Sequence, residues 1–168
     1  VRSTAIIHAV ALNYKDAQLI RERQSKIIWS PRSNIDLYGN TSPVAMLDMA
    51  GVSIALGTDW IPSGSMNMFR ELKCADEWNQ TYLDKHFTDA DLWRMVTINA
   101  AMAVGAGNSL GQLRKGYLGD LAIYDGSKNK DFRAILDGGV EDVALVLRGG
   151  APLYGDTTAM TGLAFAAP

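Results

Sequence analysis

The chain has 168 residues, of which 48% are hydrophobic, and a formal net charge of −2 at pH 7. This size and composition suit one ordinary domain, or one domain with an appendage, around a buried core. The balanced charge argues against nucleic acid or an anionic membrane as the main partner. A single cysteine, Cys74, excludes an internal disulfide and a zinc cluster built from cysteines. No apolar run approaches the roughly 18 residues of a membrane span.

Three strand-like runs alternate with helical segments at the start of the chain. The runs cover residues 3–8, residues 26–30 and a third stretch that begins at Val52 and ends at Asp59. Apolar and β-branched residues dominate them, as is typical of buried strands. With about 24 residues to a unit, this alternation predicts parallel strands with covering helices.

Helix boundaries lie between these strands. Asn13, with Asp16 three residues later, predicts the start of a helix. Ser42 as the N-cap and Pro43 in the first turn predict a second start, and Gly51 is a suitable end.

All three strands end in polar or ionisable residues. His8 ends the first, a polar turn over residues 30–34 follows the second, and Asp59 ends the third. In a parallel sheet these ends share one rim, which is where α/β proteins carry out their chemistry. Helix capping alone would account for Asp59 but would not place a histidine beside it. The sequence therefore predicts a functional site that contains His8 and Asp59.

The next segment is a loop followed by helices. Residues 60–65 form the loop, and a helix is expected from near Ser65 or Met66. Residues 76–87 are expected to be an exposed connection. Thr88, three residues before an aspartate, then predicts a further helix with an inner face at residues 92, 96, 100 and 103.

The chain changes character at residues 105–119, which contain five glycines. Short strands are expected beyond them, at residues 121–124 and 143–147. Residues 148–150 resemble a hairpin turn that leads into residues 152–154, and the last dozen residues are expected to be a loose tail. This part predicts a small β appendage.

Three βα units and a few strands make a poor stand-alone domain, because a closed (β/α)₈ barrel needs about 250 residues. Parallel strands also need both faces covered. Either another chain completes the sheet, for example in a homo-oligomer, or the chain is a piece of a larger protein. The chain begins with Val1, so its natural N-terminus is expected to lie upstream. No signal peptide is visible, and a cytoplasmic location is expected.

Five segments resemble, in the right order, motifs of the amidohydrolase superfamily, in its deaminase and chlorohydrolase branch. Residues 5–12 are similar to the sixth-strand segment, and residues 30–35 to the seventh-strand proline-x-serine-asparagine turn. Residues 50–59 are similar to the eighth-strand signature and residues 97–101 to the helix after it. Residues 110–123 are similar to the return into the β-sandwich. The resemblance implies an α/β fold. Residues 1–108 would be the C-terminal part of a (β/α)₈ TIM barrel with about three βα units, and residues 109–168 a β-sandwich segment and tail.

The resemblance also implies a metal-dependent hydrolase that cleaves a carbon–nitrogen bond of a small molecule through a metal-activated water. The metal would be zinc, with iron or manganese as alternatives, and loss of a halide is possible on the same scaffold. Asp59 matches the eighth-strand aspartate, which binds metal and takes the proton of the attacking water. His8 matches the sixth-strand histidine. That histidine contacts substrate or hydroxide in mononuclear members and binds the second metal in binuclear ones.

The sequence departs from the family pattern in its histidines. The family's histidine-x-histidine pair on the first strand and its histidine on the fifth are absent, and His86 is expected to be a surface residue. Asp59 and His8 cannot hold a zinc alone, since a catalytic zinc has about three protein ligands. The N-terminal half of the barrel, from the same protein or another chain, is thus an expected partner.

Two residues of the loop after Asp59 are candidates for substrate binding. Trp60 stands where many relatives have a small residue, and it either stacks on a planar substrate or narrows the mouth of the site. Ser63 lies in the same loop, where turn formation is the alternative explanation.

Two other functions remain open. The chain could be a truncated or degenerate fragment, or an oligomerising half-barrel, that carries no metal. It could also be a small self-contained α/β binding domain.

Overall fold

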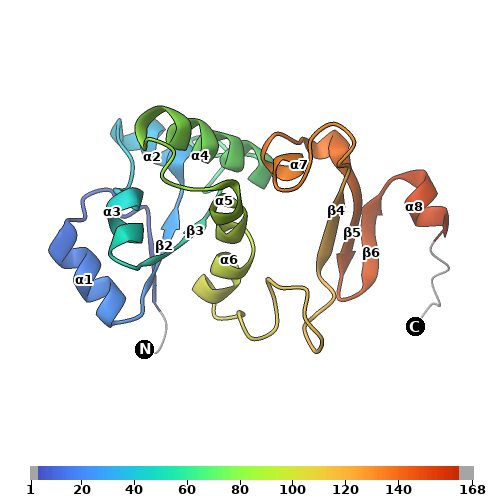
Figure 1. Cartoon of the computed structure of the whole chain (residues 1–168), viewed down its shortest axis with the longest axis horizontal. Coiled ribbons are helices and arrows are strands. Elements are labelled where there is room, and N and C mark those ends of the chain that lie inside the picture. The colour runs from blue at the N-terminus through green and yellow to red at the C-terminus, as the bar shows by residue number, and fades with distance from the viewer. Residues whose placement is uncertain (1–3, 163–168) are drawn as a thin grey trace.

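A computed structural model describes residues 4–162, which form two three-stranded sheets (Figure 1). The first is parallel, in the order β1-β2-β3, and contains β1 (Ala5–Ile7), β2 (Lys26–Trp29) and β3 (Ser53–Leu56). The predicted alternation of parallel strands and helices is therefore confirmed. Residue 3 of the first expected strand and residues 163–168 of the expected tail lie outside the described residues.

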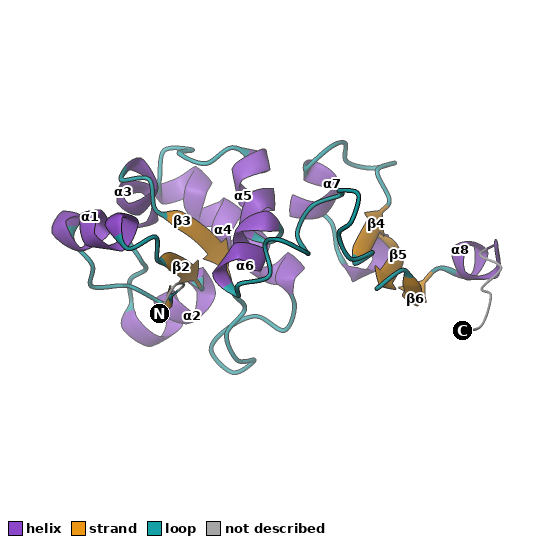
Figure 2. Ribbon diagram, turned by 90° about the horizontal axis from the view of Figure 1, so that it is seen from below, coloured by secondary structure: helices purple, strands orange, loops and turns teal. Residues whose placement is uncertain are grey.

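Six helices accompany this sheet in the described part of the chain: α1 (Tyr14–Glu22), α2 (Pro31–Tyr38), α3 (Val44–Met49), α4 (Met68–Tyr82), α5 (Asp89–Met95) and α6 (Ile98–Ala103). Helix α3 packs on β3, α6 packs on β2 and β3, and α2 lies beside α4 (Figures 1 and 2). The core lies between β2, β3 and these helices, and its most buried side chains include Ile27, Trp29, Leu47, Ile54 and Leu72.

Two of the helix starts form as predicted. Asn13 and Asp16 make a reciprocal capping box at α1, and Thr88 and Asp91 make another at α5. The third predicted helix start, at Ser42, differs from the prediction. Ser42 makes no capping bond to α3, and its hydroxyl donates instead to the carbonyl oxygen of Ala9 at 3.2 Å.

The expected polar turn at residues 30–34 is wrong, because Pro31 is the first residue of helix α2. A proline suits this position since its fixed φ matches the helix and its missing N–H would have no partner there. The helix ends at Gly39, which has a left-handed φ of 65°. A proline after a strand and a glycine eight residues later were the signals for this helix.

Three further boundaries differ from the expectation. Helix α4 is capped by Asn67 and runs to Tyr82, so most of the expected exposed connection at residues 76–87 is helical. The helix predicted after Thr88 is divided into α5 and α6. The start of the expected loose tail forms α8 (Thr157–Gly162).

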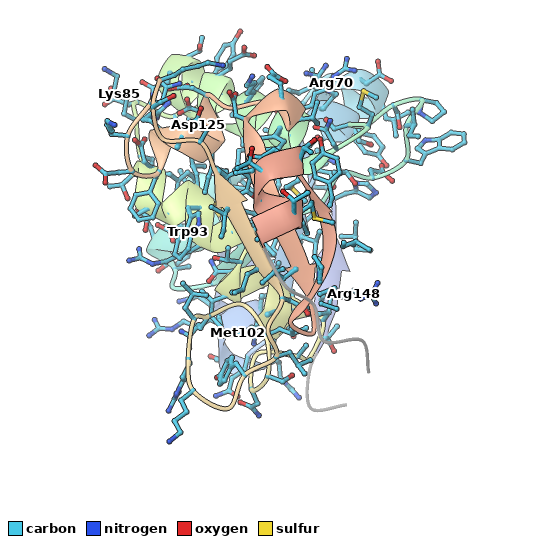
Figure 3. All side chains as sticks on the ribbon, turned by 90° about the vertical axis from the view of Figure 1, so that its right-hand side faces the viewer. Arg70, Lys85, Trp93, Met102, Asp125 and Arg148 are labelled. Atoms are coloured by element: carbon cyan, nitrogen blue, oxygen red, sulfur yellow. The ribbon has the colours of Figure 1, made fainter. Side chains whose placement is uncertain are left out.

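The second sheet is the predicted β appendage. It is an antiparallel meander of β4 (Leu121–Tyr124), β5 (Val143–Arg148) and β6 (Ala151–Gly155), with α7 (Arg133–Leu136) and a 3₁₀ turn (Val140–Asp142) between β4 and β5. Both turn residues of the β5–β6 hairpin, Gly149 and Gly150, have positive φ, as a tight hairpin requires. Asp125 follows β4 and Arg148 ends β5, so the two residues lie at opposite ends of the sheet (Figure 3).

One arginine ties α7 to the helices of the parallel sheet. The guanidinium of Arg133 donates to Asp76 of α4 at 2.7 Å and to Asp89 of α5, also at 2.7 Å. These bonds hold the pKa of the Arg133 guanidinium above its usual value, the bonds to Asp89 being the largest cause and those to Asp76 the next. No described helix is both long and apolar enough to span a bilayer.

Candidate active site

The structure brings His8 and Asp59 together at the rim where the parallel strands end. His8 directly follows β1 and Asp59 follows β3 by three residues, and the distance from Nε2 of His8 to Oδ2 of Asp59 is 3.9 Å. Their side chains are 29% and 26% exposed, so each is accessible but partly enclosed. Both residues also have left-handed φ values, 69° and 54°. Strained backbone of this kind is common where side chains are aimed for function.

The Asp59 carboxylate is held by a serine of α2. Ser33 is fully buried, and its hydroxyl donates a hydrogen bond to Oδ2 of Asp59. Ser63 lies behind it, with its Oγ atom 3.5 Å from that of Ser33. Ser63 is 6% exposed, so it contacts the partner of Asp59 and does not face open solvent.

The His8 imidazole is held by the next residue of the same helix. Nδ2 of Asn34, which is also fully buried, lies 3.0 Å from Nδ1 of His8. Tyr38, at the end of α2, packs its ring edge-on to the imidazole with centroids 6.1 Å apart. Ser33 and Asn34 therefore belong to the site. The sequence placed them on the correct rim but gave them no role of their own.

Helix α2 is in turn fixed by a buried carboxyl of α4. Glu71 has no exposed surface, and its Oε1 atom accepts a hydrogen bond from the backbone N–H of Arg32 at 3.3 Å. Burial raises the pKa of Glu71 above its usual value, although the hydrogen bond from the backbone of Arg32 opposes the shift. This contact anchors the first turn of α2, which carries Ser33 and Asn34.

The loop after Asp59 is tightly closed and points two apolar side chains outward. The N–H of Ser65 donates to the carbonyl oxygen of Thr58 at 2.9 Å, and a Cβ atom at Gly64 would lie only 2.0 Å from that same oxygen. Only glycine fits at this position. Trp60 and Ile61 at the outer side of the loop are 65% and 73% exposed.

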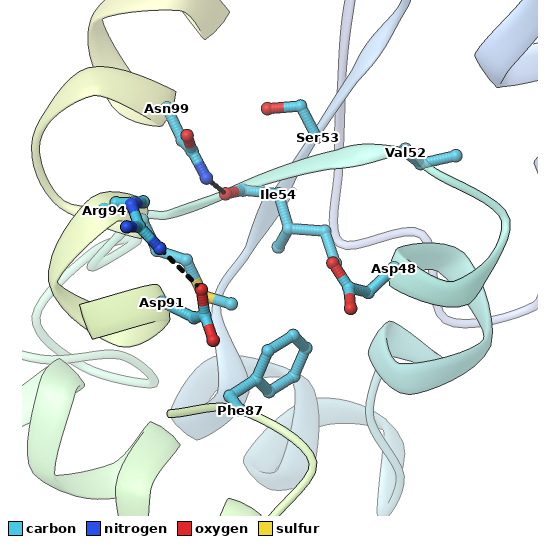
Figure 4. A pocket seen from close by; sticks show the side chains of 9 residues that line it. Asp48, Val52, Ser53, Ile54, Phe87, Asp91, Arg94 and Asn99 are labelled. Atoms are coloured by element: carbon cyan, nitrogen blue, oxygen red, sulfur yellow. Dashed lines mark hydrogen bonds and ion pairs between the residues drawn. The ribbon is translucent and has the colours of Figure 1, made fainter. Parts of the chain in front are cut away.

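His86 lies apart from this rim. It is half-buried, not a fully exposed surface residue, and its Nε2 atom lies 2.8 Å from Oδ2 of Asp48. Asp48 also lines a small cavity of about 70 Å³ around the amino end of β3 (Figure 4). Its charged and amide side chains already have partners, because Asn99 donates to the carbonyl oxygen of Ile54 and Arg94 pairs with Asp91, both at 2.9 Å. We therefore assign no site to this cavity.

Asp59 suits one corner of a metal site. Carboxylate and imidazole are common zinc ligands, but two donors each about 2 Å from one tetrahedral ion lie roughly 3.3 Å apart. The 3.9 Å between His8 and Asp59 is longer than this. Within residues 4–162, no three histidine, cysteine, aspartate or glutamate side chains are arranged so that they could hold a metal ion. Any further ligands would come from outside the described residues.

Comparison with known proteins defines the class of this chain. The model of the amidohydrolase family matches residues 2–152. The chain therefore belongs to the amidohydrolase family, and the resemblance seen in its motifs is confirmed.

Two curated relatives carry the name 5-methylthioadenosine/S-adenosylhomocysteine deaminase. The one from Syntrophobacter fumaroxidans is 36% identical over 121 residues, which cover 70% of this chain and 28% of the relative. The one from Thermococcus onnurineus is 35% identical over 130 residues, which cover 76% of this chain and 30% of the relative. The chain thus spans about three tenths of the length of these relatives.

Solved structures share the fold. An adenosine deaminase from Xanthomonas campestris with bound zinc matches with a TM-score of 0.82 and 25% identity, over 94% of this chain and 40% of that one. Atrazine chlorohydrolase from Arthrobacter aurescens, complexed with zinc, matches with a TM-score of 0.74 and 19% identity, over 94% and 39% of the two chains. At that identity the second match concerns the fold alone.

Proposed function

We propose that this chain is the C-terminal part of a zinc-dependent amidohydrolase that hydrolyses a carbon–nitrogen bond of a small molecule, with deamination as the favoured reaction. Iron or manganese could replace zinc. The main support is the pairing of His8 with Asp59, each held by a buried side chain of α2. The deaminase names of the curated relatives support an amino-substituted purine nucleoside as the substrate class.

In this proposal the residues of the chain hold the metal on one side and move protons. A bound divalent metal would supply a water acidic enough to react near neutral pH. Asp59 would be a metal ligand, would accept the proton of the attacking water and would pass it to the leaving nitrogen. The hydrogen bond from Ser33 keeps Oδ2 of Asp59 in place while the proton moves. His8 would orient the group under attack.

The fold assignment that goes with this function has two parts. Residues 1–108 would supply the last three βα units of a (β/α)₈ barrel, and residues 109–168 a segment of the β-sandwich and the tail. The remaining strands, with the missing histidine ligands, would come from the same polypeptide upstream or from another chain. Trp60 would contribute to the substrate mouth, because it is exposed on the closed loop directly after Asp59.

Zinc content and ammonia release test the proposal in the longer polypeptide that includes the upstream histidines. We expect bound zinc, and ammonia release from adenosine, 5-methylthioadenosine or S-adenosylhomocysteine. Asp59→Asn should lose zinc. His8→Gln should keep zinc but slow turnover by about 10²–10⁴-fold, the usual contribution of a positioned proton-transfer or hydrogen-bonding group. His86→Gln is the matched control and should change neither quantity.

Two results would count against the proposal. A preparation that contains the upstream histidines but holds no metal would favour a non-catalytic fragment or half-barrel. A His8→Gln variant whose loss of activity is matched by its loss of thermal stability would give His8 a structural role.

A further inference from the structure

A line of buried hydrogen bonds runs from the core to His8. Nε1 of Trp29 donates to Oγ1 of Thr41 at 2.7 Å, and that hydroxyl lies 3.3 Å from Oδ1 of Asn34. Nδ2 of Asn34 then lies 3.0 Å from Nδ1 of His8. Trp29 and Asn34 are fully buried and Thr41 is 7% exposed, so solvent does not compete for these groups.

The first member of the line fixes the direction of every bond. An indole N–H can only donate, so the Thr41 oxygen accepts from Trp29 and uses its single proton to donate to Oδ1 of Asn34. The amide must then present its NH₂ group to His8. If the amide were turned over, Thr41 would accept twice and its own buried proton would lack an acceptor, which is unfavourable.

The direction of the line determines the tautomer of His8. Because Nδ1 accepts the hydrogen bond from Asn34, the neutral imidazole carries its proton on Nε2. Nε2 is the atom that faces Oδ2 of Asp59. A metal ligand needs a lone pair at the bound nitrogen, and Nε2 has none in this tautomer.

We propose that Trp29, Thr41 and Asn34 are positioning residues that hold His8 as an Nε2–H hydrogen-bond donor toward the Asp59 side of the rim. His8 is then not a metal ligand. The use of this donor in catalysis rests on the proposed function, whereas the tautomer itself rests only on the hydrogen bonds of the chain.

The position of the proton can be measured in the 168-residue chain by long-range ¹H–¹⁵N correlation NMR of labelled histidine. The sequence contains only two histidines, so His86→Asn assigns the spectrum by removing one imidazole. The measurement is made at about pH 9, where an imidazole is ordinarily neutral. We expect His8 to show a protonated Nε2 and a bare Nδ1. A protonated Nδ1 with a bare Nε2 would overturn the proposal.

Two variants test whether the buried line sets the tautomer. Asn34→Asp offers only acceptors to His8 and should draw a proton to Nδ1. Thr41→Val keeps the shape of the side chain but removes the hydroxyl that fixes the Asn34 amide, so a mixture of the two His8 tautomers is expected. This variant provides a test if Asn34→Asp fails to fold. Ser42→Ala is the matched control, since its hydroxyl bonds to Ala9 next to His8 but lies outside the line. Unchanged tautomers in folded variants of both Asn34 and Thr41 would overturn the proposal.

Zinc titration separates this inference from the proposed function. Adding Zn²⁺ to the longer polypeptide that includes the upstream histidines should leave the Nε2 proton of His8 in place, with the His8 signal assigned by its loss in His8→Gln. Displacement of that proton by Zn²⁺ would overturn the inference. Ammonia release by the longer polypeptide is a separate measurement. Its absence would remove the proposed function but leave the tautomer unchanged.

Discussion

Glu71 is a buried carboxyl whose charge is unfavourable in the folded chain. Its burial raises its pKa above 4.5, so the folded state holds the proton more tightly than the unfolded state does. The free energy of unfolding therefore falls as pH rises from about 4.5 through the folded-state pKa, and a tenfold difference in proton affinity between the two states corresponds to about 1.4 kcal/mol. The carboxyl lies where it anchors the first turn of α2 beside the site.

The Glu71→Gln variant should be more stable than the parent chain at neutral and alkaline pH. The amide oxygen can still accept from the N–H of Arg32, and no buried charge forms. Thermal unfolding at a series of pH values should show this advantage shrinking as pH falls through the folded-state pKa of Glu71 toward 4.5. Glu77→Gln, at an exposed position of the same helix, should show no such trend. A Glu71→Gln variant that is less stable than the parent at pH 8 would mean that contacts of the charged carboxylate outweigh its burial.

Among the individual residues of the site, His8 and Asp59 could be identified from the sequence because they are ionisable residues at the ends of apolar runs. It did not assign roles to Ser33 and Asn34, since serine and asparagine after a proline are equally typical of a turn. Their function depends on which helix face meets the sheet rim. That depends on tertiary contacts between α2 and α4, such as the bond between Glu71 and Arg32, which are 39 residues apart in the chain.

Helix α5 is an element whose start is fixed by two side chains. The hydroxyl of Thr88 accepts from the N–H of Asp91 at 3.3 Å, and the Asp91 carboxylate accepts from the N–H of Thr88 at 3.1 Å. Burial works to raise the pKa of Asp91, but its bonds with Thr88 and the charge of Arg94 outweigh it and lower the pKa. A local motif of this kind can be found from the sequence alone.

Replacing Thr88 with alanine should lower the free energy of unfolding by about 1 kcal/mol, because one end of the capping box is lost. Chemical denaturation measures the change. Thr81→Ala, at an exposed site inside α4, is the control and should be neutral or slightly stabilising, since alanine favours helix. Equal decreases in the free energy of unfolding for Thr88→Ala and Thr81→Ala would contradict a stabilising role for the capping box.

Helices whose length depends on contacts with distant parts of the chain were predicted less well than such local motifs. The three parallel strands and the β5–β6 hairpin have clear patterns of apolar residues and glycines, and they form as predicted. The length of α4 does not follow from local pattern. Its polar second half is held by distant partners, such as the backbone of Phe87, which exchanges two hydrogen bonds with the buried side chain of Asn79.

For the molecule as a whole, Arg133 is the main polar link between the two halves described. Burial of Asp76 works to raise its pKa, but hydrogen bonds from Arg133 and Gln80 and the charge of Arg133 prevail, so the pKa of Asp76 lies below 3.8. A lowered carboxyl pKa adds stability above about pH 4, and this stability is lost as pH falls through the folded-state pKa.

Replacing Arg133 with methionine should therefore cost about 1–3 kcal/mol at pH 7, as expected for hydrogen bonds to charged groups. The cost should decrease below pH 3.8 as Asp76 takes up a proton. Urea denaturation at pH 7 and pH 3 measures both values. Lys128→Met removes a single bond from an exposed lysine to Asp142 and should cost less, because solvent screens the charge of Lys128. A cost for Arg133→Met that does not change with pH would contradict a role for the Asp76 charge.

The position of Ser33 and Asn34 in one helical turn restricts which changes in chain length the protein can tolerate. Each residue added or removed between Trp29 and Asn34 would rotate the rest of α2 by about 100° and would turn both side chains away from Asp59 and His8 together. The glycine-containing connection at residues 105–119 joins α6 to β4 and carries none of the side chains that hold Asp59 or His8. Insertions and deletions that preserve the site are thus expected in that connection and excluded from the start of α2.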